Sequence, residues 1–392
     1  MKQLKIRDQK RNRIMTTIDA IVGFPFKIIG LFKNKRIDDL TKENISKILL
    51  LRTDNIGDVL LLTPSIHAIR EKYPSARIDV LVRPIAKEVL LNNLDISNIM
   101  VSRVPWFMNK IMVKDIISMV ADVIKIRRAS YDLIIDFRGD FRNILFYLFL
   151  GNGKYLISSD RSGGTYFLTH VVIYDEDIHA IDKNISLLAP LGLYPKDKNM
   201  RMTVSEADRI NLKNKIGDLE RRDRYLIGIH PGASSITRRW PLEKFSEVIK
   251  TLSANIPCKF YVSGDNLEKE LGVGLKRLTG DLVLDLTGRL SIPELAALIE
   301  KTDLFICNET GIMHLSVALK TNTISLYGPQ LPMKYGHENE NSRILWKEFD
   351  CCPCLHHFGC HRTGTSRALC LDAISVDEVV KCAMGVLFKN LL

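Results

Sequence analysis

The stretch KILLLRTDNIGDVLLLTPSIHAIREKY, residues 47–73, joins a continuous apolar run, a glycine-containing turn and a helical pattern. Continuous hydrophobicity, as in residues 48–51, is typical of a strand buried on both faces, which occurs in parallel sheets. From Val59 onward the apolar residues have the spacing of a helix. A buried strand that leads into a helix is the beginning of a βαβ unit, so this stretch predicts a parallel α/β sheet.

The same alternation of buried strand and helix recurs along the chain in two series. The first continues through RIDVLVR, NIMVSR and YDLIIDFR, up to residue 138. The second starts near Tyr225 and includes YLIGIHPG, CKFYVSG, LVLDLTG, DLFICN and TNTISLYGP. We therefore expect two doubly wound domains, at residues 47–200 and 225–375, a charged linker at 201–224 and a C-terminal helix at 376–392.

Size and composition agree with two globular domains. The chain has 392 residues, of which 46% are hydrophobic and 26% charged. No uncharged apolar run reaches the 18 or so residues that a membrane-spanning helix needs, so a multi-spanning membrane protein is not expected.

Positive charge is concentrated at the N-terminus. Residues 1–47 contain twelve Lys or Arg and five Asp or Glu, which gives seven of the net +11 charges. A basic stretch up to Arg13 precedes a largely apolar segment at 14–32. Residues 1–46 therefore suit attachment to an anionic membrane surface, where each basic residue contributes about 1 kcal/mol.

The basic segment also fits arrangements without a membrane. A solvated tail, or a helix packed on the body of the protein, would show the same composition. Nucleic acid is not expected as a partner, because the body lacks a basic face with interleaved aromatic residues and a recognition motif.

Candidate site residues follow from the predicted sheets, since open α/β sheets bind ligands beyond the carboxyl ends of their strands. The residues that qualify by position are Asp58, Gly232, Gly264, Asp285 and Glu309. Gly57 allows a tight turn or a positive φ before Asp58. The spacing alone fits two roles of Asp58 equally well. One is a helix cap, which stabilises a helix by about 1 kcal/mol, and the other is a general base.

Two segments of the second series have the composition of phosphate sites. HPGASSITRRWPLEKF, residues 230–245, offers Ser234, Ser235 and Arg238 to an anion, although a solvated polar loop would look similar. CNETGIMHLSVAL, residues 307–319, places Thr310 and Gly311 at a helix start, where N–H groups and the helix dipole favour an anion. His314 either donates to that anion or packs in the core.

Several motifs together carry a resemblance to a known family. They are IGDVLLLTP, YDLIIDFRG, HAIDKNISLLAPLG, HPGASSITRRWP, ETGIMHLSVAL and ISLYGP, in this order from about residue 48 to the C-terminus. In order and spacing the chain resembles the ADP-heptose:lipopolysaccharide heptosyltransferases of glycosyltransferase family 9. The resemblance implies a GT-B fold, in which two Rossmann-like domains face a central cleft.

The resemblance also implies roles for the candidate residues. Asp58 is expected to be the general base that deprotonates the acceptor, with Asn55 and Gly57 in the acceptor loop. The resemblance and the composition together assign six residues to the donor diphosphate: Ser234, Ser235 and Arg238 in one loop, and Thr310, Gly311 and His314 at the other. Asp285 is expected to contact the nucleotide ribose, and Glu309 the donor sugar. Relatives usually carry Asp at position 309, which leaves the identity of the sugar open.

The implied reaction is a single displacement with inversion, from an ADP-sugar to a lipid-linked glycan, at the cytoplasmic face of the membrane. No cofactor is expected, although Asp175-Glu176-Asp177 has a spacing that could hold a divalent ion. Three alternatives to this function remain: transfer from a different nucleotide sugar, transfer to a protein acceptor, and a non-catalytic nucleotide-binding protein associated with a membrane. A nicotinamide-dependent oxidoreductase is disfavoured because residues 47–60 lack G-x-G-x-x-G.

Five of the eight cysteines fall within residues 351–370. In this Cys-rich loop, Cys352, Cys354, Cys360 and Cys370 could bind a structural zinc ion, with His356, His357 and His361 nearby. The alternative is a reduced, redox-sensitive loop near the acceptor, because a nucleotide-sugar donor implies the cytosol, where disulfides are disfavoured.

Overall fold

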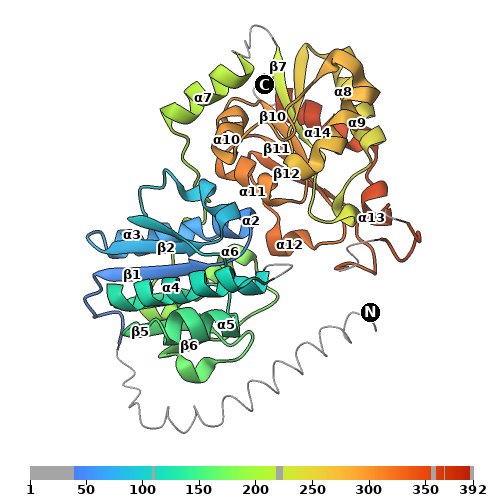
Figure 1. The fold of residues 1–392 in the computed structure, drawn as a ribbon. Coiled ribbons are helices and arrows are strands. Elements are labelled where there is room, and N and C mark those ends of the chain that lie inside the picture. Colours follow the sequence, from blue (N-terminus) through green and yellow to red (C-terminus); the bar gives the residue numbers. More distant parts are fainter. Residues whose placement is uncertain (1–38, 108–110, 218–223, 355–358, 366, 389–392) are drawn as a thin grey trace. The chain divides into compact units, whose positions relative to one another are not determined.

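The computed structural model describes residues 39–107, 111–217, 224–354, 359–365 and 367–388. The chain divides into two compact units, the first ending at Met200 and the second beginning at Arg201. Each unit contains one six-stranded parallel sheet covered by helices (Figure 1). The predicted α/β class with two doubly wound sheets is confirmed.

The sheet of the first unit has the strand order β3-β2-β1-β4-β5-β6, with β1 and β4 at its centre. Its strands are β1 (Lys47–Arg52), β2 (Arg77–Val82), β3 (Asn98–Val101), β4 (Leu133–Asp136), β5 (Tyr155–Ser159) and β6 (His170–Val172). Its principal helices are α2 (Ile56–Leu60), α3 (Thr63–Lys72), α4 (Val113–Ala129), α5 (Phe141–Asn143), the π-helical η4 (Ile144–Phe149) and α6 (Ala180–Ser186).

The central strands of this sheet are buried and run parallel to one another. Residues 48–51 of β1 are completely buried, as their unbroken aliphatic run predicts. Because β1 pairs in parallel with both β2 and β4, all three strands end at the same edge of the sheet. The residues that follow β1 and β4 are therefore brought together at this carboxyl edge.

The second unit repeats the plan with the strand order β12-β11-β10-β7-β8-β9. Its strands are β7 (Tyr225–His230), β8 (Cys258–Val262), β9 (Val283–Asp285), β10 (Leu304–Asn308), β11 (Thr323–Tyr327) and β12 (Ser342–Trp346). Its helices are α7 (Glu206–Ile216), α8 (Leu242–Asn255), α9 (Lys269–Thr279), α10 (Ile292–Glu300), α11 (Gly311–Ala318), α12 (Pro332–Tyr335), α13 (Leu369–Asp372) and α14 (Val376–Phe388).

Several elements lie outside the two predicted series. Strands β5, β6 and β12 were not anticipated, because their short apolar runs are bounded by polar residues and lie at or near the edges of the sheets. Residues 84–90, which have a helical pattern, form two short 3-10 helices instead of one helix. The segment 201–224, predicted to be a linker, contains α7, and α7 packs against α10.

The structure gives no information on the predicted membrane segment, because residues 1–38 lie outside the described residues. Within the described ranges, no helix has both the length and the apolar character required to cross a bilayer.

Candidate functional site

Asp58 lies in the first turn of α2, directly beyond the carboxyl end of β1. Its Oδ2 accepts a hydrogen bond of 3.3 Å from the backbone N–H of Asn55, the residue that precedes the helix. Its side chain is 29% exposed. Asp58 therefore caps α2 and also keeps carboxylate surface available to a substrate, so the two predicted roles are compatible.

Gly57 is the second residue of α2 and is not among the residues with positive φ. Its backbone is therefore helical, and the positive φ that glycine would allow at this position is not used; the place of Gly57 in the acceptor loop stays a prediction. Asn55 has extended backbone, and its Oδ1 accepts a hydrogen bond of 3.3 Å from Arg83.

Arg52, the last residue of β1, fixes the position of Asp58. Its Nη2 lies 3.0 Å from Asp58 Oδ1, and its Nε lies 3.0 Å from Asp54 Oδ2. Its Nη1 donates to the backbone carbonyl of Phe137 and to Asn184 Oδ1. The planar guanidinium thus links the loop after β1 to the loop after β4 and to α6.

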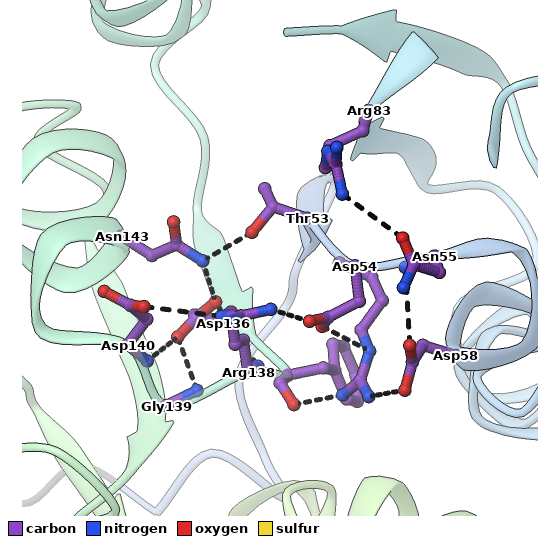
Figure 2. A network of polar contacts seen from close by, with 12 residues as sticks. Thr53, Asp54, Asn55, Asp58, Arg83, Asp136, Arg138, Gly139, Asp140 and Asn143 are labelled. Atoms are coloured by element: carbon purple, nitrogen blue, oxygen red, sulfur yellow. Dashed lines mark hydrogen bonds and ion pairs between the residues drawn. The ribbon is translucent and has the colours of Figure 1, made fainter. Parts of the chain in front are cut away.

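Alternating charges extend from Asp58 into the loop that follows β4 (Figure 2). Asp54 forms ion pairs with Arg52 on one side and with Arg138 on the other. Arg138 also pairs with Asp140, which binds Arg142 through two hydrogen bonds of 2.9 and 2.7 Å. Burial lowers the pKa of Arg138 to about 10.

Asp136, the last residue of β4, fixes the loop that follows this strand by hydrogen bonds. This fully buried carboxylate accepts hydrogen bonds from Asn143 Nδ2 at 2.9 Å and Gly139 N at 2.8 Å (Figure 2). It also accepts one from Ser158 Oγ at 3.1 Å. Burial raises the pKa of Asp136 to about 6. Asp136 lies in the motif YDLIIDFRG, and no role was predicted for it. Its position at the carboxyl end of a strand, which also singled out Asp58, could have identified it.

In the second unit, two polar side chains, Asn308 and Arg239, hold the backbone of the loop after β7. Asn308, at the end of β10, accepts from Trp240 N at 3.0 Å and donates to the carbonyl of Pro231 at 2.8 Å. Arg239 donates through Nε and Nη2 to the carbonyl of Ala233. Arg239 is therefore occupied with its own loop, which leaves Arg238 as the guanidinium available to an anion.

The predicted phosphate residues of this loop have different surroundings. Ser234 is exposed, whereas Ser235 is buried and its Oγ lies 2.8 Å from Thr237 Oγ1. Arg238 Nη1 lies 3.4 Å from Glu309 Oε2, and this pair joins the loop after β7 to the loop after β10. The predicted donor-sugar residue and the predicted diphosphate residue are thus brought into contact.

Helix α11 begins beside this ion pair. Thr310 is its N-cap with extended backbone, and Gly311 is its first residue. His314 is 5% exposed, and its Nδ1 lies 2.8 Å from Nε2 of His337, a residue that the sequence analysis did not select. The N-terminus of α11, Arg238 and Ser234 together offer N–H, guanidinium and hydroxyl donors to an anion.

The predicted ribose residue, Asp285, ends β9. Its Oδ1 accepts from the backbone N–H and the hydroxyl of Thr287, at 2.9 and 2.7 Å. A second carboxylate, Glu268, was not selected from the sequence because it follows no strand directly. A Cβ at Gly232 would lie 2.0 Å from Glu268 Oε1, so glycine at 232 leaves room for this carboxylate at the end of β7.

For the cysteines of residues 351–370, the sequence predicts either a structural zinc site or a reduced, redox-sensitive loop. Among the described residues, no group of three or more His, Cys, Asp or Glu side chains is arranged to hold a metal ion, and this includes Asp175, Glu176 and Asp177. All eight cysteines are described, and none of them forms a disulfide. The Cys352 and Cys370 thiols form a hydrogen bond that raises the pKa of Cys352 and lowers that of Cys370, and Cys352 Sγ lies 3.6 Å from the carbonyl of Gly328. His356 and His357 lie outside the described residues.

Comparison with known proteins identifies the family. The family model for glycosyltransferase family 9 (heptosyltransferase) matches residues 123–361, more than half of the chain. The chain belongs to glycosyltransferase family 9. The predicted family and enzyme class are therefore confirmed, and this member is a glycosyltransferase.

Individual relatives agree with this assignment. The family 9 chain is 28% identical to lipopolysaccharide heptosyltransferase 3 of Escherichia coli K12, over 82% of its own length and 94% of the relative. Among solved structures, it is similar to E. coli ADP-heptose lps heptosyltransferase II, with a TM-score of 0.72, 18% identity and coverage of 88% and 100% of the two chains. It is also similar to E. coli heptosyltransferase WaaC with ADP-2-deoxy-2-fluoro heptose, with a TM-score of 0.64, 17% identity and coverage of 86% and 99%. These structures confirm the GT-B fold.

Proposed function

We propose that the chain transfers a heptose from ADP-heptose to a lipopolysaccharide core acceptor, with inversion at the anomeric carbon. One observation carries the proposal. A chain of family 9 has a carboxylate, Asp58, that caps helix α2, is partly exposed and lies at the carboxyl edge of the first sheet. The names of the relatives support the substrate classes, since one is a lipopolysaccharide heptosyltransferase and another was solved with an ADP-heptose analogue.

In the proposed reaction, Asp58 is the general base. The acceptor hydroxyl oxygen attacks the anomeric carbon, the bond from that carbon to the diphosphate oxygen breaks, and Asp58 accepts the hydroxyl proton. The product is the glycoside and the leaving group is ADP. A base on the side opposite the diphosphate gives inversion in one step, without a covalent sugar intermediate.

The second unit supplies the groups that stabilise the leaving diphosphate in this proposal. Arg238, Ser234 and the N-terminus of α11 at Thr310 and Gly311 are donors that match the charge developing on the diphosphate oxygens. These donors need no metal ion to neutralise the diphosphate, so we expect transfer to continue in the presence of a chelator.

The remaining roles are assigned by position. Asp285 and Glu268 lie at the ends of β9 and β7, where a ribose would be held, and Glu309 would contact the heptose. Asn55 and Gly57 precede Asp58 and would border the acceptor. Because a lipopolysaccharide core is lipid-linked, we place the enzyme at the cytoplasmic face of a membrane, as a peripheral protein.

The proposal is tested by incubating the purified chain with ADP-heptose, uridine and guanosine diphosphate sugars, and truncated core oligosaccharides. We expect nucleotide release from ADP-heptose alone, dependent on an acceptor, and a product whose anomeric configuration, read by NMR, is opposite to that of the donor. Release from uridine or guanosine sugars alone would contradict the heptose assignment. ADP binding without turnover on any acceptor would support a non-catalytic nucleotide-binding protein instead.

A further inference from the structure

Helix α4 presents an apolar face that no described residue covers. Five of its apolar side chains are exposed, and they recur at intervals of three and four residues, which places them on one side of the helix. They are Val113 (73% exposed), Ile116 (47%), Ile117 (63%), Val120 (48%) and Ile124 (44%). The opposite side of α4 packs into the core of the first unit through Met119 and Ile126.

The apolar face continues beyond the helix start. Ile111 and Met112, which precede α4, are 55% and 44% exposed. Seven large apolar side chains within fourteen residues, 111–124, are therefore open to solvent. Contiguous apolar patches of this kind mark an interaction surface, whereas single exposed apolar residues need no explanation.

The exposed charged residues of α4 are basic, and its buried charged residues are acidic. Its exposed charged residues are all basic: Lys114, Lys125, Arg127 and Arg128. Its two acidic residues are turned inward: Asp115 is 1% exposed and accepts the backbone N–H of Met112, and Asp122 is 6% exposed. The solvent-facing side of α4 therefore combines an apolar stripe with positive charge and carries no exposed acidic residue.

The position of α4 in the unit relates this face to Asp58. Helix α4 leads from the end of β3 to the beginning of β4, and both strands belong to one parallel sheet. Its N-terminal end therefore lies toward the carboxyl edge, where Asp58 follows β1, and Figure 1 shows α4 lying along one face of the sheet. The most exposed members of the stripe, Val113 and Ile117, are at that end of the helix.

We propose that this face of α4 docks on the surface of a membrane that contains anionic lipid. Apolar side chains would enter the boundary between headgroups and acyl chains while Lys and Arg contact lipid phosphates, the arrangement expected of an interfacial amphipathic helix. A symmetric pair of copies fits less well, since it would bring four basic residues against four with no exposed acidic residue on α4 to pair with them. The inference deepens the proposed function, on which it rests for the lipid-linked acceptor.

The test is flotation of the full chain with phosphatidylcholine vesicles, with and without phosphatidylglycerol. We expect binding that requires phosphatidylglycerol, and a fall in bound fraction on the order of tenfold for Val113→Asp combined with Ile117→Asp. The matched control combines Ile210→Asp on α7 with Val273→Asp on α9, since both residues are 52% exposed apolar helix positions and the change in charge is the same. The control should bind like the unmodified chain. Lys114→Gln with Arg128→Gln should weaken binding to anionic vesicles several-fold.

Circular dichroism melts establish that the α4 variant folds, and transfer to a lipid-free core oligosaccharide in solution should be unchanged by it. Vesicle binding equal to that of the unmodified chain would overturn the inference. Dissociation of a dimer by the α4 variant, measured by sedimentation without vesicles and with vesicle binding intact, would overturn it in favour of a second copy. Vesicle binding needs no sugar donor, so a failure of heptose transfer would overturn the proposed function and leave this inference standing.

Discussion

Arg52 Nη2 lies 3.0 Å from Asp58 Oδ1, and the same guanidinium contacts Asp54, the carbonyl of Phe137 and Asn184. The other oxygen, Oδ2, accepts the backbone N–H of Asn55 at 3.3 Å, so each carboxylate oxygen of Asp58 has a partner that restricts its rotamer. The arginine therefore gives Asp58 a fixed direction without covering it. The two residues would therefore have different roles: Asp58 would accept the proton of the acceptor hydroxyl, and Arg52 would position Asp58.

Replacement of Asp58 by Asn should abolish most turnover and leave donor binding in place. The amide keeps the size of the side chain but cannot accept the acceptor proton, and loss of a general base costs about 10²- to 10⁴-fold in rate. We expect kcat to fall within this range while the Kd for ADP, measured by calorimetry, stays within about twofold.

Asp208→Asn is the matched control for the capping role of Asp58. Asp208 occupies the same third position of α7 and accepts the backbone N–H of Ser205 at 2.9 Å. Both substitutions weaken a helix cap, worth about 1 kcal/mol, but only the change at Asp58 should reduce kcat. Equal activity of the two variants would show that Asp58 is a cap alone.

Arg52→Lys should lower kcat by roughly 10- to 100-fold, with the KM for the donor unchanged. Lysine keeps the positive charge, but its single ammonium group cannot replace a fork that reaches four partners on three segments. Loss of the fork leaves Asp54, which is 14% exposed, with a weaker partner, so the free energy of unfolding should also fall by about 1–3 kcal/mol.

Arg209→Lys provides the comparison for Arg52. Arg209 binds both carboxylate oxygens of Glu300 at 2.9 and 3.0 Å on the surface of the second unit. Exposed pairs contribute about 0–1 kcal/mol, so this variant should keep the activity and nearly all of the stability of the unmodified chain. If Arg52→Lys retained full kcat, the positioning role would be wrong even if the variant were less stable.

Sequence reasoning located Asp58 because a strand and a helix start can be recognised locally. It did not find Arg138, which pairs with Asp54 only when β1 and β4 lie side by side across some eighty residues, nor Arg52, which lies only six residues before Asp58. The ion pair of Arg238 with Glu309 was missed for the same reason, because it joins the loops after β7 and β10. Glu268 is the last residue of a short 3-10 helix, Asn266–Glu268, and follows no strand directly, so its place beside Gly232 and His230 is seen only in the folded structure.

Arg238→Gln should weaken ADP binding. Its guanidinium is the one in the loop after β7 that is not held by a loop carbonyl, and a charge-assisted hydrogen bond to phosphate is worth about 1.5–3 kcal/mol, which corresponds to roughly 10- to 150-fold in Kd. Arg238→Lys keeps the charge and should recover part of the loss. Calorimetric titration with ADP measures both variants.

Glu309 supplies an independent check on Arg238. Its carboxylate lies 3.4 Å from the same guanidinium and would compete with a diphosphate for it. Glu309→Gln should therefore leave ADP affinity equal or higher, while lowering turnover if Glu309 contacts the sugar. Unchanged ADP affinity in Arg238→Gln would place the diphosphate elsewhere.

Titration of Asp136 should make the first unit less stable as pH rises from about 4 to about 6. Burial raises its pKa from 3.8 to about 6, so between these values the folded state holds a proton that the unfolded chain releases. The folded state is therefore favoured at the acid end of the window, by roughly 3 kcal/mol once pH falls below both pKa values. Asp136→Asn removes this dependence.

The difference in stability between the unmodified chain and Asp136→Asn should therefore change across this window, as read by hydrogen exchange in urea on peptides from β1 and β4. Asp132 is the control with opposite sign: burial acts to raise its pKa, but hydrogen bonds from Ser46 and Lys47 outweigh burial and hold that pKa below 3.8. Stability from Asp132 is present above pH 4 and is lost as pH falls below that value, so the difference between the unmodified chain and Asp132→Asn should stay nearly constant from pH 4 to 6 and shrink only at lower pH. A constant difference between the unmodified chain and Asp136→Asn from pH 4 to 7 would mean that Asp136 stays ionised and that its hydrogen bonds from Asn143, Gly139 and Ser158 outweigh its burial.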